Sequence, residues 1–333
     1  QEAHEVHQSA LVVDLHCDLL LTTHFTGWNW TRRHRPNPLP GAPLMGHTDL
    51  PRLRDGNIGC MALGMVVSPL RRRSGPRAIH RYLDMLHRQV ERAPDSLEIA
   101  CSSQAIRTAR QRGRIACFAG LEGAHALNGQ LDELPALKAR GLGYVGLAHF
   151  TGNAACRPMV GWGSNDHSGL TDFGRELVDE LNRLGIAVDV AHVNRPGLIE
   201  VCARSPVPVI CSHTACTAVH RSPRGLDDAQ LRAIADTGGV VGVIFVTPFI
   251  GPGGLEAVVA HLNHLRRTIG VEHAALGTDW EGFALYPRDL NSADKLPLLT
   301  DALLRDGWTP QEILAVYGDN FLRALAELER VTP

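Results

Sequence analysis

Side chains that can bind a metal ion follow several short apolar runs in this sequence. The first run, residues 11–15, leads into His16-Cys17-Asp18. Because side chains of a β-strand alternate between its two faces, His16 and Asp18 would point the same way at the end of a strand. A single His-x-Asp arises often by chance, and a strand that runs into a polar turn explains it equally well. The motif gains meaning only if other strand ends supply further ligands.

Five more apolar runs end in a potential metal ligand. In chain order these are Glu122, His149, His192, His213 and Asp279. Imidazole and carboxylate groups together suit zinc or a similar divalent ion, and one carboxylate can bridge two ions about 3.5–4 Å apart. So many donors require two ions. A carboxylated lysine cannot be the bridge, because Lys138 lies in a helical pattern and Lys295 in a loop, which leaves Glu122.

Apolar runs and amphipathic segments alternate along the chain. We expect strands at residues 11–16, 58–66, 115–120, 143–148, 186–190, 207–211, 239–246 and 273–278. We expect helices near 78–93, 131–140, 171–184, 195–204, 227–237, 255–269 and 310–328, with start signals at Thr171-Asp172 and Asp227-Asp228. This alternation predicts a (β/α)₈ barrel. A doubly wound open sheet is the alternative, but no Gly-x-Gly-x-x-Gly turn follows the first strand.

The barrel is predicted to be a single domain over residues 1–333, since no linker or internal repeat divides the chain. The segment 27–51 is too long for a simple connection between a strand and a helix, and we expect it to help wall the active site. His47-Thr48-Asp49 inside it repeats the His-x-Asp pattern. Prolines on either side do not impose strand geometry, so this second copy is interpreted as structural.

Composition excludes several classes of protein. With 333 residues, 44% hydrophobic and 20% charged, and a net charge of -2, the chain is an ordinary globular protein without a basic surface for nucleic acid. Its longest apolar stretches fall short of the roughly 20 residues of a membrane helix, and no lipid-anchor tail is seen. The chain opens at Gln1, so both a cytoplasmic location and export after removal of a signal peptide stay open. Its eight cysteines form no C-x-x-C pair and are expected to be free thiols.

Spaced motifs along nearly the whole chain resemble the membrane (renal) dipeptidase family, the M19 metallopeptidases. The motifs are His16-Cys17-Asp18, Asp49-Leu50-Pro51-Arg52-Leu53-Arg54-Asp55-Gly56, Leu121-Glu122-Gly123, Leu147-Ala148-His149, Gly169-Leu170-Thr171-Asp172-Phe173-Gly174, Asn182-Arg183-Leu184-Gly185, Asp189-Val190-Ala191-His192-Val193, Ser212-His213-Thr214, Gly277-Thr278-Asp279-Trp280-Glu281-Gly282 and Gly318-Asp319-Asn320-Phe321-Leu322-Arg323.

The resemblance implies a binuclear zinc site. His16 and Asp18 would bind one ion, His192 and His213 the other, and Glu122 would bridge the two. A water shared by two zinc ions loses a proton near neutral pH, so the bridging hydroxide would attack a peptide carbonyl. The expected activity is hydrolysis of small dipeptides, including L-Xaa-D-Xaa, and a homodimer is suggested.

Four more residues receive roles from the resemblance. His149 would contact the substrate and polarise the scissile carbonyl, and Asp279 would handle protons near the shared water. Arg224 would grip the substrate carboxylate, because a guanidinium offers two parallel hydrogen bonds, and Asn320 would sit close by. Arg221 competes with Arg224, which is preferred for its spacing from His213.

Two positions depart from the family pattern. Gly225 stands where asparagine commonly follows the arginine, and Phe249 stands where a hydroxyl-bearing aromatic is expected. These departures keep open a binuclear hydrolase of N-acyl amino acids or phosphoesters. A non-catalytic metal-binding scaffold is a third reading, but it predicts a lost ligand, whereas every expected ligand is present.

Overall fold

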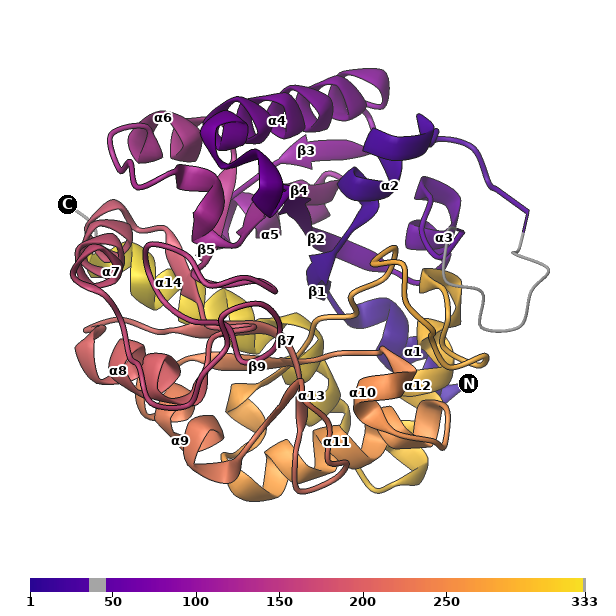
Figure 1. Ribbon diagram of the computed structural model, residues 1–333. Helices are drawn as coiled ribbons and strands as arrows, with labels where there is room; N and C mark the ends of the chain where they lie inside the picture. The colour runs from indigo at the N-terminus through magenta and orange to yellow at the C-terminus, as the bar shows by residue number, and fades with distance from the viewer. Residues whose placement is uncertain (36–45, 332–333) are drawn as a thin grey trace.

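The computed structural model of the protein describes residues 1–35 and 46–331, and only the backbone at 71–73 and 331. Eight parallel strands close into a barrel with helices around it, as the (β/α)₈ prediction requires (Figure 1). The strands in order around the barrel are β1 (Val12–Cys17), β2 (Ile58–Val66), β4 (Ile115–Glu122), β5 (Leu142–Gly146), β6 (Ala187–Asp189), β7 (Ile210–Cys216), β9 (Val240–Val243) and β10 (Ala274–Leu276). A pairing of β1 with β10 closes the ring.

Each predicted strand is present, and two short strands were not predicted. β3 (Leu97–Ile99) pairs with the start of β4, and β8 (Gly225–Leu226) pairs with the end of β7. Strands of two or three residues are too short to show a sequence period. They lie beside the barrel and do not change its order of eight strands.

The helices follow the predicted pattern with additions. The predicted helices are observed as α4 (Gly75–Arg92), α6 (Leu134–Ala139), α7 (Asp172–Leu184), α8 (Arg195–Arg204), α9 (Asp228–Asp236), α11 (Leu255–Thr268), α13 (Pro310–Leu314) and α14 (Asn320–Val331). The helices that the sequence did not indicate are α1 (Glu2–Ser9), α2 (Leu19–Thr26), α3 (Leu50–Asp55), α5 (Ser103–Gln111), α10 (Thr247–Ile250) and α12 (Leu296–Arg305). The single helix predicted at 310–328 is α13 and α14 joined by a π-helical turn, Ala315–Asp319.

Both predicted helix starts are confirmed by their caps. The Thr171 side chain accepts a hydrogen bond from Gly174 N at the start of α7. Asp227 forms a capping box with Gln230 at the start of α9. Each cap satisfies an N–H group that lacks a partner within the helix, so the helix begins at the residue that the sequence indicates.

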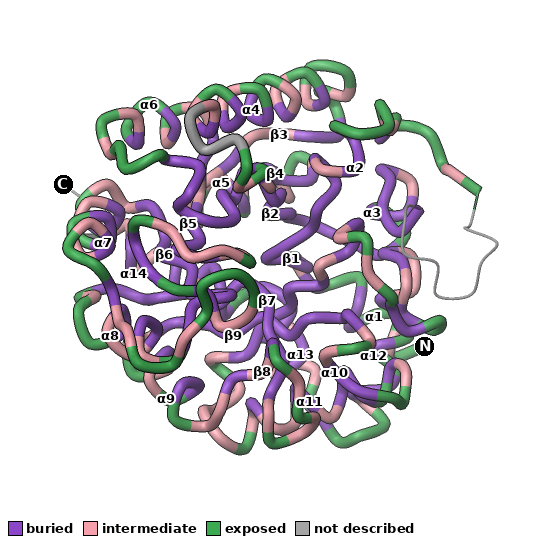
Figure 2. The backbone as a smooth tube through the Cα atoms, in the orientation of Figure 1, coloured by how far each residue is buried: buried purple, intermediate pink, exposed green. Residues whose placement is uncertain are grey.

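The barrel strands are buried on both faces. Every residue of β1, β4 and β7 is buried, and the strands run through the purple centre of Figure 2. Helices cover the outer face of a parallel barrel while side chains fill its interior, which is why these strands read as continuous apolar runs. At one end of the barrel, Phe321 of α14 stacks on Phe118 of β4 with ring centroids 6.0 Å apart.

The described parts of the long segment 27–51 form a structural contact with the loop after β10. His47 N, Thr48 N and Thr48 Oγ1 all donate to Glu281 Oε1, at 2.9, 2.8 and 2.9 Å. Asp49 caps α3. The structural interpretation of His47-Thr48-Asp49 is therefore confirmed. The wall expected from this segment stays a prediction, because residues 36–45 lie outside the described residues. No helix in the described ranges is both long and apolar enough to cross a membrane.

Candidate metal and substrate site

Four predicted histidines surround Glu122 at the carboxyl ends of the strands. Glu122 Oε1 lies 2.9 Å from His192 Nε2, 3.5 Å from His213 Nε2, 3.6 Å from His149 Nε2 and 3.7 Å from His16 Nε2. Glu122 ends β4, and the histidines follow or belong to four other strands. The structure thus brings together residues that are up to 197 positions apart, with Glu122 at the centre.

His16 and Asp18 converge by a different route from the one that simple strand alternation predicts. The register of β1 against β2 shifts between Asp14 and Cys17, so His16 lies in an irregular part of the strand. Asp18 lies beyond the strand and begins α2. His16 Nε2 and Asp18 Oδ1 still end 3.6 Å apart. An irregularity of this kind, such as a β-bulge, re-aims a side chain, which is why such features recur beside active sites.

Two other site residues have strained backbones. His192 has φ 65° and Asp279 has φ 59°, both in the left-handed region that favours glycine. Such a conformation costs on the order of 1 kcal/mol and persists only where the surroundings hold it. Asp279 N donates to His16 O at 2.9 Å, which ties this turn to β1.

The partners of His213 and His16 fix which ring nitrogen is free. Ser212 Oγ donates to Asp189 Oδ2 at 2.6 Å, so it accepts from His213 Nδ1 at 2.9 Å. The phenol of Tyr144 donates to Leu15 O at 3.2 Å and accepts from His16 Nδ1 at 2.8 Å. With a proton on Nδ1, Nε2 is the nitrogen of each ring that can bind a metal ion, and it faces Glu122. Metal-binding histidines are oriented by partners of this kind.

Two buried aspartates, Asp14 and Asp189, hold neighbouring strand ends in the same way. Asp14 accepts from Thr278 N and Thr278 Oγ1, at 2.9 and 2.7 Å, one residue before Asp279. Asp189 accepts from Ser212 N and Ser212 Oγ, at 2.8 and 2.6 Å, one residue before His213. Each aspartate also accepts from a backbone N–H two residues further along its own chain segment. The site residues are therefore anchored in pairs across adjacent strands.

Several carboxyl groups of the site lie close together in a buried part of the protein. Burial raises the pKa of Glu122 to about 8, and burial with the neighbouring Asp18 raises the pKa of Asp279 to about 7. Burial lowers the pKa of His149 to about 3 and that of His192 well below its usual range. His16 differs from the other histidines: burial lowers its pKa, but the carboxylates of Glu122 and Asp18 outweigh burial and raise that pKa to about 10. A divalent cation bound among these donors would take over from the His16 proton in balancing the carboxylate charge.

The donor set fits a pair of metal ions. Donor atoms of His16, Asp18 and Glu122 lie within 4.8 Å of one another, and so do those of Glu122, His192 and His213. The two groups share Glu122. His16 Nε2 and Asp18 Oδ1 are buried without a hydrogen-bond partner among the described residues, which fits atoms that bind a metal ion.

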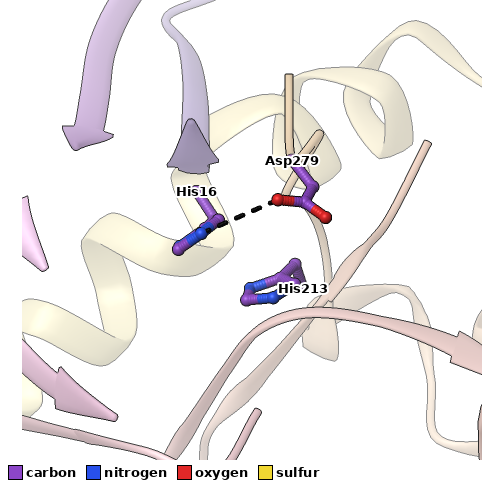
Figure 3. Close-up of side chains that lie close together, drawn as sticks. All are labelled: His16, His213 and Asp279. Atoms are coloured by element: carbon purple, nitrogen blue, oxygen red, sulfur yellow. Dashed lines mark ion pairs between the residues drawn. The ribbon is translucent and has the colours of Figure 1, made fainter. Parts of the chain in front are cut away.

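A third group of donors crosses between these two. It consists of His16, His213 and Asp279, which face one another in Figure 3. The rings of His16 and His213 stack with centroids 4.0 Å apart, and His16 Nε2 lies 3.8 Å from Asp279 Oδ1. Asp279 thus reaches the edge of the donor cluster.

Arg224 shares a cavity with several of these residues. A cavity of about 540 Å³ is lined by Asp18, Glu122, His149, His192, Arg224 and Asp279 among others. The Arg224 side chain is buried, and its guanidinium donates to His213 O at 3.1 Å and contacts Met159 Sδ at 2.9 Å. It forms no ion pair with any carboxylate of the described residues. Arg221, the competing candidate, is exposed.

The two departures from the family pattern lie close to Arg224. A Cβ added at Gly225 would come within 2.6 Å of Thr217 Oγ1, so a close approach of Thr217 explains the glycine. Phe249 lines the catalytic cavity and presents a hydrocarbon ring there.

Asn320 is the one predicted site residue that the structure places elsewhere. Its Nδ2 donates to Val271 O at 2.7 Å and to Ala274 O at 2.8 Å. Ala274 is the first residue of β10, whereas the donor cluster around Glu122 lies at the carboxyl ends of the strands. Asn320 therefore supports α14 at the opposite end of the barrel, and its expected position near the substrate is wrong.

Sequence reasoning missed the residues that support the site. These residues lie within apolar runs and do not follow the spacing by which the metal donors were found; they are Asp14, Tyr144, Asp189 and Ser212. Two of them could have been found from the sequence, because Asp14 and Asp189 are acidic residues inside strands that are otherwise largely apolar. A buried carboxylate requires hydrogen-bond donors, so each indicates a supporting network.

A parallel (β/α)₈ barrel whose strand ends converge on histidines and carboxylates is the architecture of a metal-dependent hydrolase. The chain belongs to the membrane dipeptidase family, peptidase family M19, whose model matches residues 1–333. Membership makes it a metallopeptidase of the dipeptidase type.

Solved structures agree with this family. A crystal structure of the dipeptidase AC, a family M19 metallo peptidase, is 25% identical, with a TM-score of 0.85 over 96% of this chain and 99% of that one. A metallo peptidase from Rhodobacter sphaeroides, liganded with a phosphinate mimic of the dipeptide L-Ala-D-Ala, gives the same values. The probable dipeptidase PvdM from Pseudomonas aeruginosa shares the fold at 21% identity, with a TM-score of 0.87 over 100% and 98% of the two chains.

Proposed function

We propose that this protein is a binuclear zinc dipeptidase that hydrolyses small dipeptides with a free C-terminal carboxylate. The observation that carries the proposal is Arg224, a buried guanidinium that shares one cavity with the donor cluster around Glu122 and pairs with none of the described carboxylates. A buried charge without a partner is costly, so a carboxylate from the substrate is the partner it requires.

The zinc ions are proposed to sit in the two donor groups that share Glu122. His16 and Asp18 would hold one ion and His192 and His213 the other. Two nitrogen ligands of one tetrahedral zinc ion, each about 2.0–2.1 Å from it, lie roughly 3.3 Å apart, close to the 3.0 Å between His192 Nε2 and His213 Nε2. When bound, such a pair of ions activates a shared water and polarises the scissile carbonyl.

His149 and Asp279 are proposed to serve the reacting amide. Burial keeps His149 neutral, so an imidazole N–H can donate to the oxygen of the carbonyl as negative charge develops there. Asp279 has a pKa raised to about 7 in the metal-free protein, which suits a group that takes up a proton and passes it to the leaving amine. Both side chains line the cavity that contains Arg224.

The accepted dipeptides are proposed to include L-Xaa-D-Xaa. Support comes from the Rhodobacter sphaeroides metallo peptidase, which was solved with a mimic of L-Ala-D-Ala and has 25% identity over 96% of this chain. Arg224 would fix the carboxylate of the second residue whatever its handedness, because a guanidinium recognises the planar carboxylate group alone.

The experiment that tests this function combines metal analysis with a dipeptide panel. Purified protein is stripped with a chelator, reloaded with zinc, and assayed for amino acid release from Ala-Ala, L-Ala-D-Ala, Ala-Ala amide and N-acetyl-Ala. We expect about two zinc ions per chain, zinc-dependent cleavage of both free dipeptides, and weak cleavage of the amide. Preferential cleavage of N-acetyl-Ala would instead favour the alternative function, a hydrolase of N-acyl amino acids. That alternative stays open because Phe249 presents a hydrocarbon ring in the cavity where a hydroxyl-bearing aromatic was expected. The predicted homodimer is tested by the mass of the protein in solution.

A further inference from the structure

A second cavity adjoins the catalytic cavity and has no part in the proposed chemistry. It measures about 620 Å³, and three residues, Leu21, Val66 and Phe283, line both cavities. The rest of its apolar lining includes Phe25, Val67, Ala78 and Tyr82. The Tyr82 hydroxyl donates to Val66 O at 2.9 Å, so its polar atom is already bonded. Most of the lining residues are therefore apolar or aromatic, which suits an apolar group.

The second cavity lies across the barrel from Arg224. Arg224 follows β7, whereas Val66 ends β2, and in the closed ring three strands separate β2 from β7 on either side (Figure 1). The donor cluster around Glu122 lies between them. A dipeptide whose carboxylate is held at Arg224 and whose peptide bond lies at the cluster must extend its N-terminal residue toward β2. That direction leads to Leu21, Val66 and Phe283.

Aromatic rings are exposed at the border of this cavity. Phe25 is 69% exposed and Phe283 is 38% exposed, and their rings meet edge to face at 6.2 Å. When an apolar ligand covers large exposed apolar side chains beside a cavity, apolar surface is removed from water, and this contributes favourably to binding. The polar residues of the lining are His24, Ser68, Ser74 and Arg81, and of these His24, Ser68 and Arg81 are exposed.

We propose that the second cavity is the binding site for the side chain of the substrate's N-terminal residue, and that it selects a large apolar or aromatic side chain. The proposal rests on the dipeptidase function proposed above. It specifies the substrate class as dipeptides of the Phe-Xaa or Leu-Xaa type, in preference to those that begin with a small or charged residue.

The test compares Phe-Ala with Ala-Ala in the zinc-loaded enzyme. Burying a benzyl group in a fitted apolar cavity gives a kcat/KM for Phe-Ala roughly tenfold to a hundredfold above that for Ala-Ala. Ala78→Phe places a ring in the second cavity from α4, at a residue outside the lining of the catalytic cavity. We expect this variant to lower the Phe-Ala to Ala-Ala ratio to about one, whereas Ala78→Ser keeps the ratio.

A second variant guards against a folding defect at the buried Ala78. Phe25→Ala removes an exposed ring, and we expect it to lower the same ratio by roughly threefold to tenfold. Leu298→Ala, at an exposed residue of α12 that is 49% accessible, is the matched control and should leave both rates unchanged.

The outcomes separate the two proposals. A wild-type enzyme that cleaves Ala-Ala but shows no preference for Phe-Ala overturns the second cavity as a side-chain site and leaves the dipeptidase function intact. The same conclusion follows if folded Ala78→Phe and Phe25→Ala both keep the wild-type ratio. An enzyme that cleaves neither dipeptide contradicts the proposed function, and the inference that rests on it falls as well.

Discussion

Removing the hydroxyl of Ser212 should weaken zinc binding more than it weakens the fold. Ser212 Oγ donates to Asp189 at 2.6 Å and accepts from His213 Nδ1 at 2.9 Å, so Ser212→Ala leaves the imidazole without the partner that holds its proton on Nδ1. Loss of such a supporting partner lowers metal affinity by about tenfold to a hundredfold, which corresponds to about 1.4–2.8 kcal/mol. The hydroxyl–carboxylate bond itself contributes about 1.5–3 kcal/mol to the free energy of unfolding.

Thr278→Val is the matched control. Thr278 Oγ1 donates to the buried Asp14 at 2.7 Å and accepts from Trp280 N at 3.2 Å, and it bonds to no imidazole nitrogen among the described residues. Both variants should therefore lose a similar free energy of unfolding in the metal-free state, measured by urea denaturation. Zinc affinity, measured by competition with a chromogenic chelator, should fall in Ser212→Ala alone. Equal affinity losses in the two variants, or an affinity within twofold of wild type in Ser212→Ala, would refute the reasoning.

Three further predictions concern individual residues. Asp279→Asn should lower kcat by about a hundredfold to ten-thousandfold while the zinc content stays at the wild-type value, because Asp279 is proposed to move protons; loss of zinc would show that it is a ligand instead. In the metal-free protein, burial raises the pKa of Glu122 from 4.5 to about 8, so this carboxyl stabilises the fold below about pH 4.5 and loses that effect as the pH rises toward 8. The free energy of unfolding of the wild type should thus fall relative to Glu122→Gln between about pH 5 and pH 8 in urea melts, and parallel pH profiles would contradict the assignment. Gly225→Ala should lower the free energy of unfolding by about 1–3 kcal/mol, because the new Cβ would lie 2.6 Å from Thr217 Oγ1. Adding Thr217→Ala should restore part of that free energy. A double variant whose free energy of unfolding falls by the sum of the two single losses would be inconsistent with this contact.

The barrel could be predicted because its strands are buried on both faces. Continuous apolar runs such as β4 therefore stand out from the amphipathic helices between them. Short elements such as β3, β8 and α1 were missed because they contain too few residues to show a hydrophobic period in the sequence. They form through contacts with the rest of the fold. The helix at 310–328 was predicted as one piece, and the π-helical turn at Ala315–Asp319 that divides it has no sequence signature.

The metal donors were the most predictable part of the site, since each follows an apolar run and parallel strands deliver their ends to one edge. Asn320 was placed incorrectly because the resemblance assigned it a role, whereas its amide bonds the first residue of β10. Proximity in a motif does not reveal which end of a barrel a helix covers.

The sequence by itself determined the barrel, the residue types at its strand ends and the family, because all three depend on the order and spacing of side chains along the chain. Tertiary structure decided how those side chains are used. The register shift around His16, the left-handed backbones of His192 and Asp279, and the hydrogen bonds from Ser212 to Asp189 are set by contacts between strands that are distant in sequence. The second cavity beside β2 likewise exists only once α2, α4 and the loop after β10 are packed together, because a cavity is a property of their joint surface.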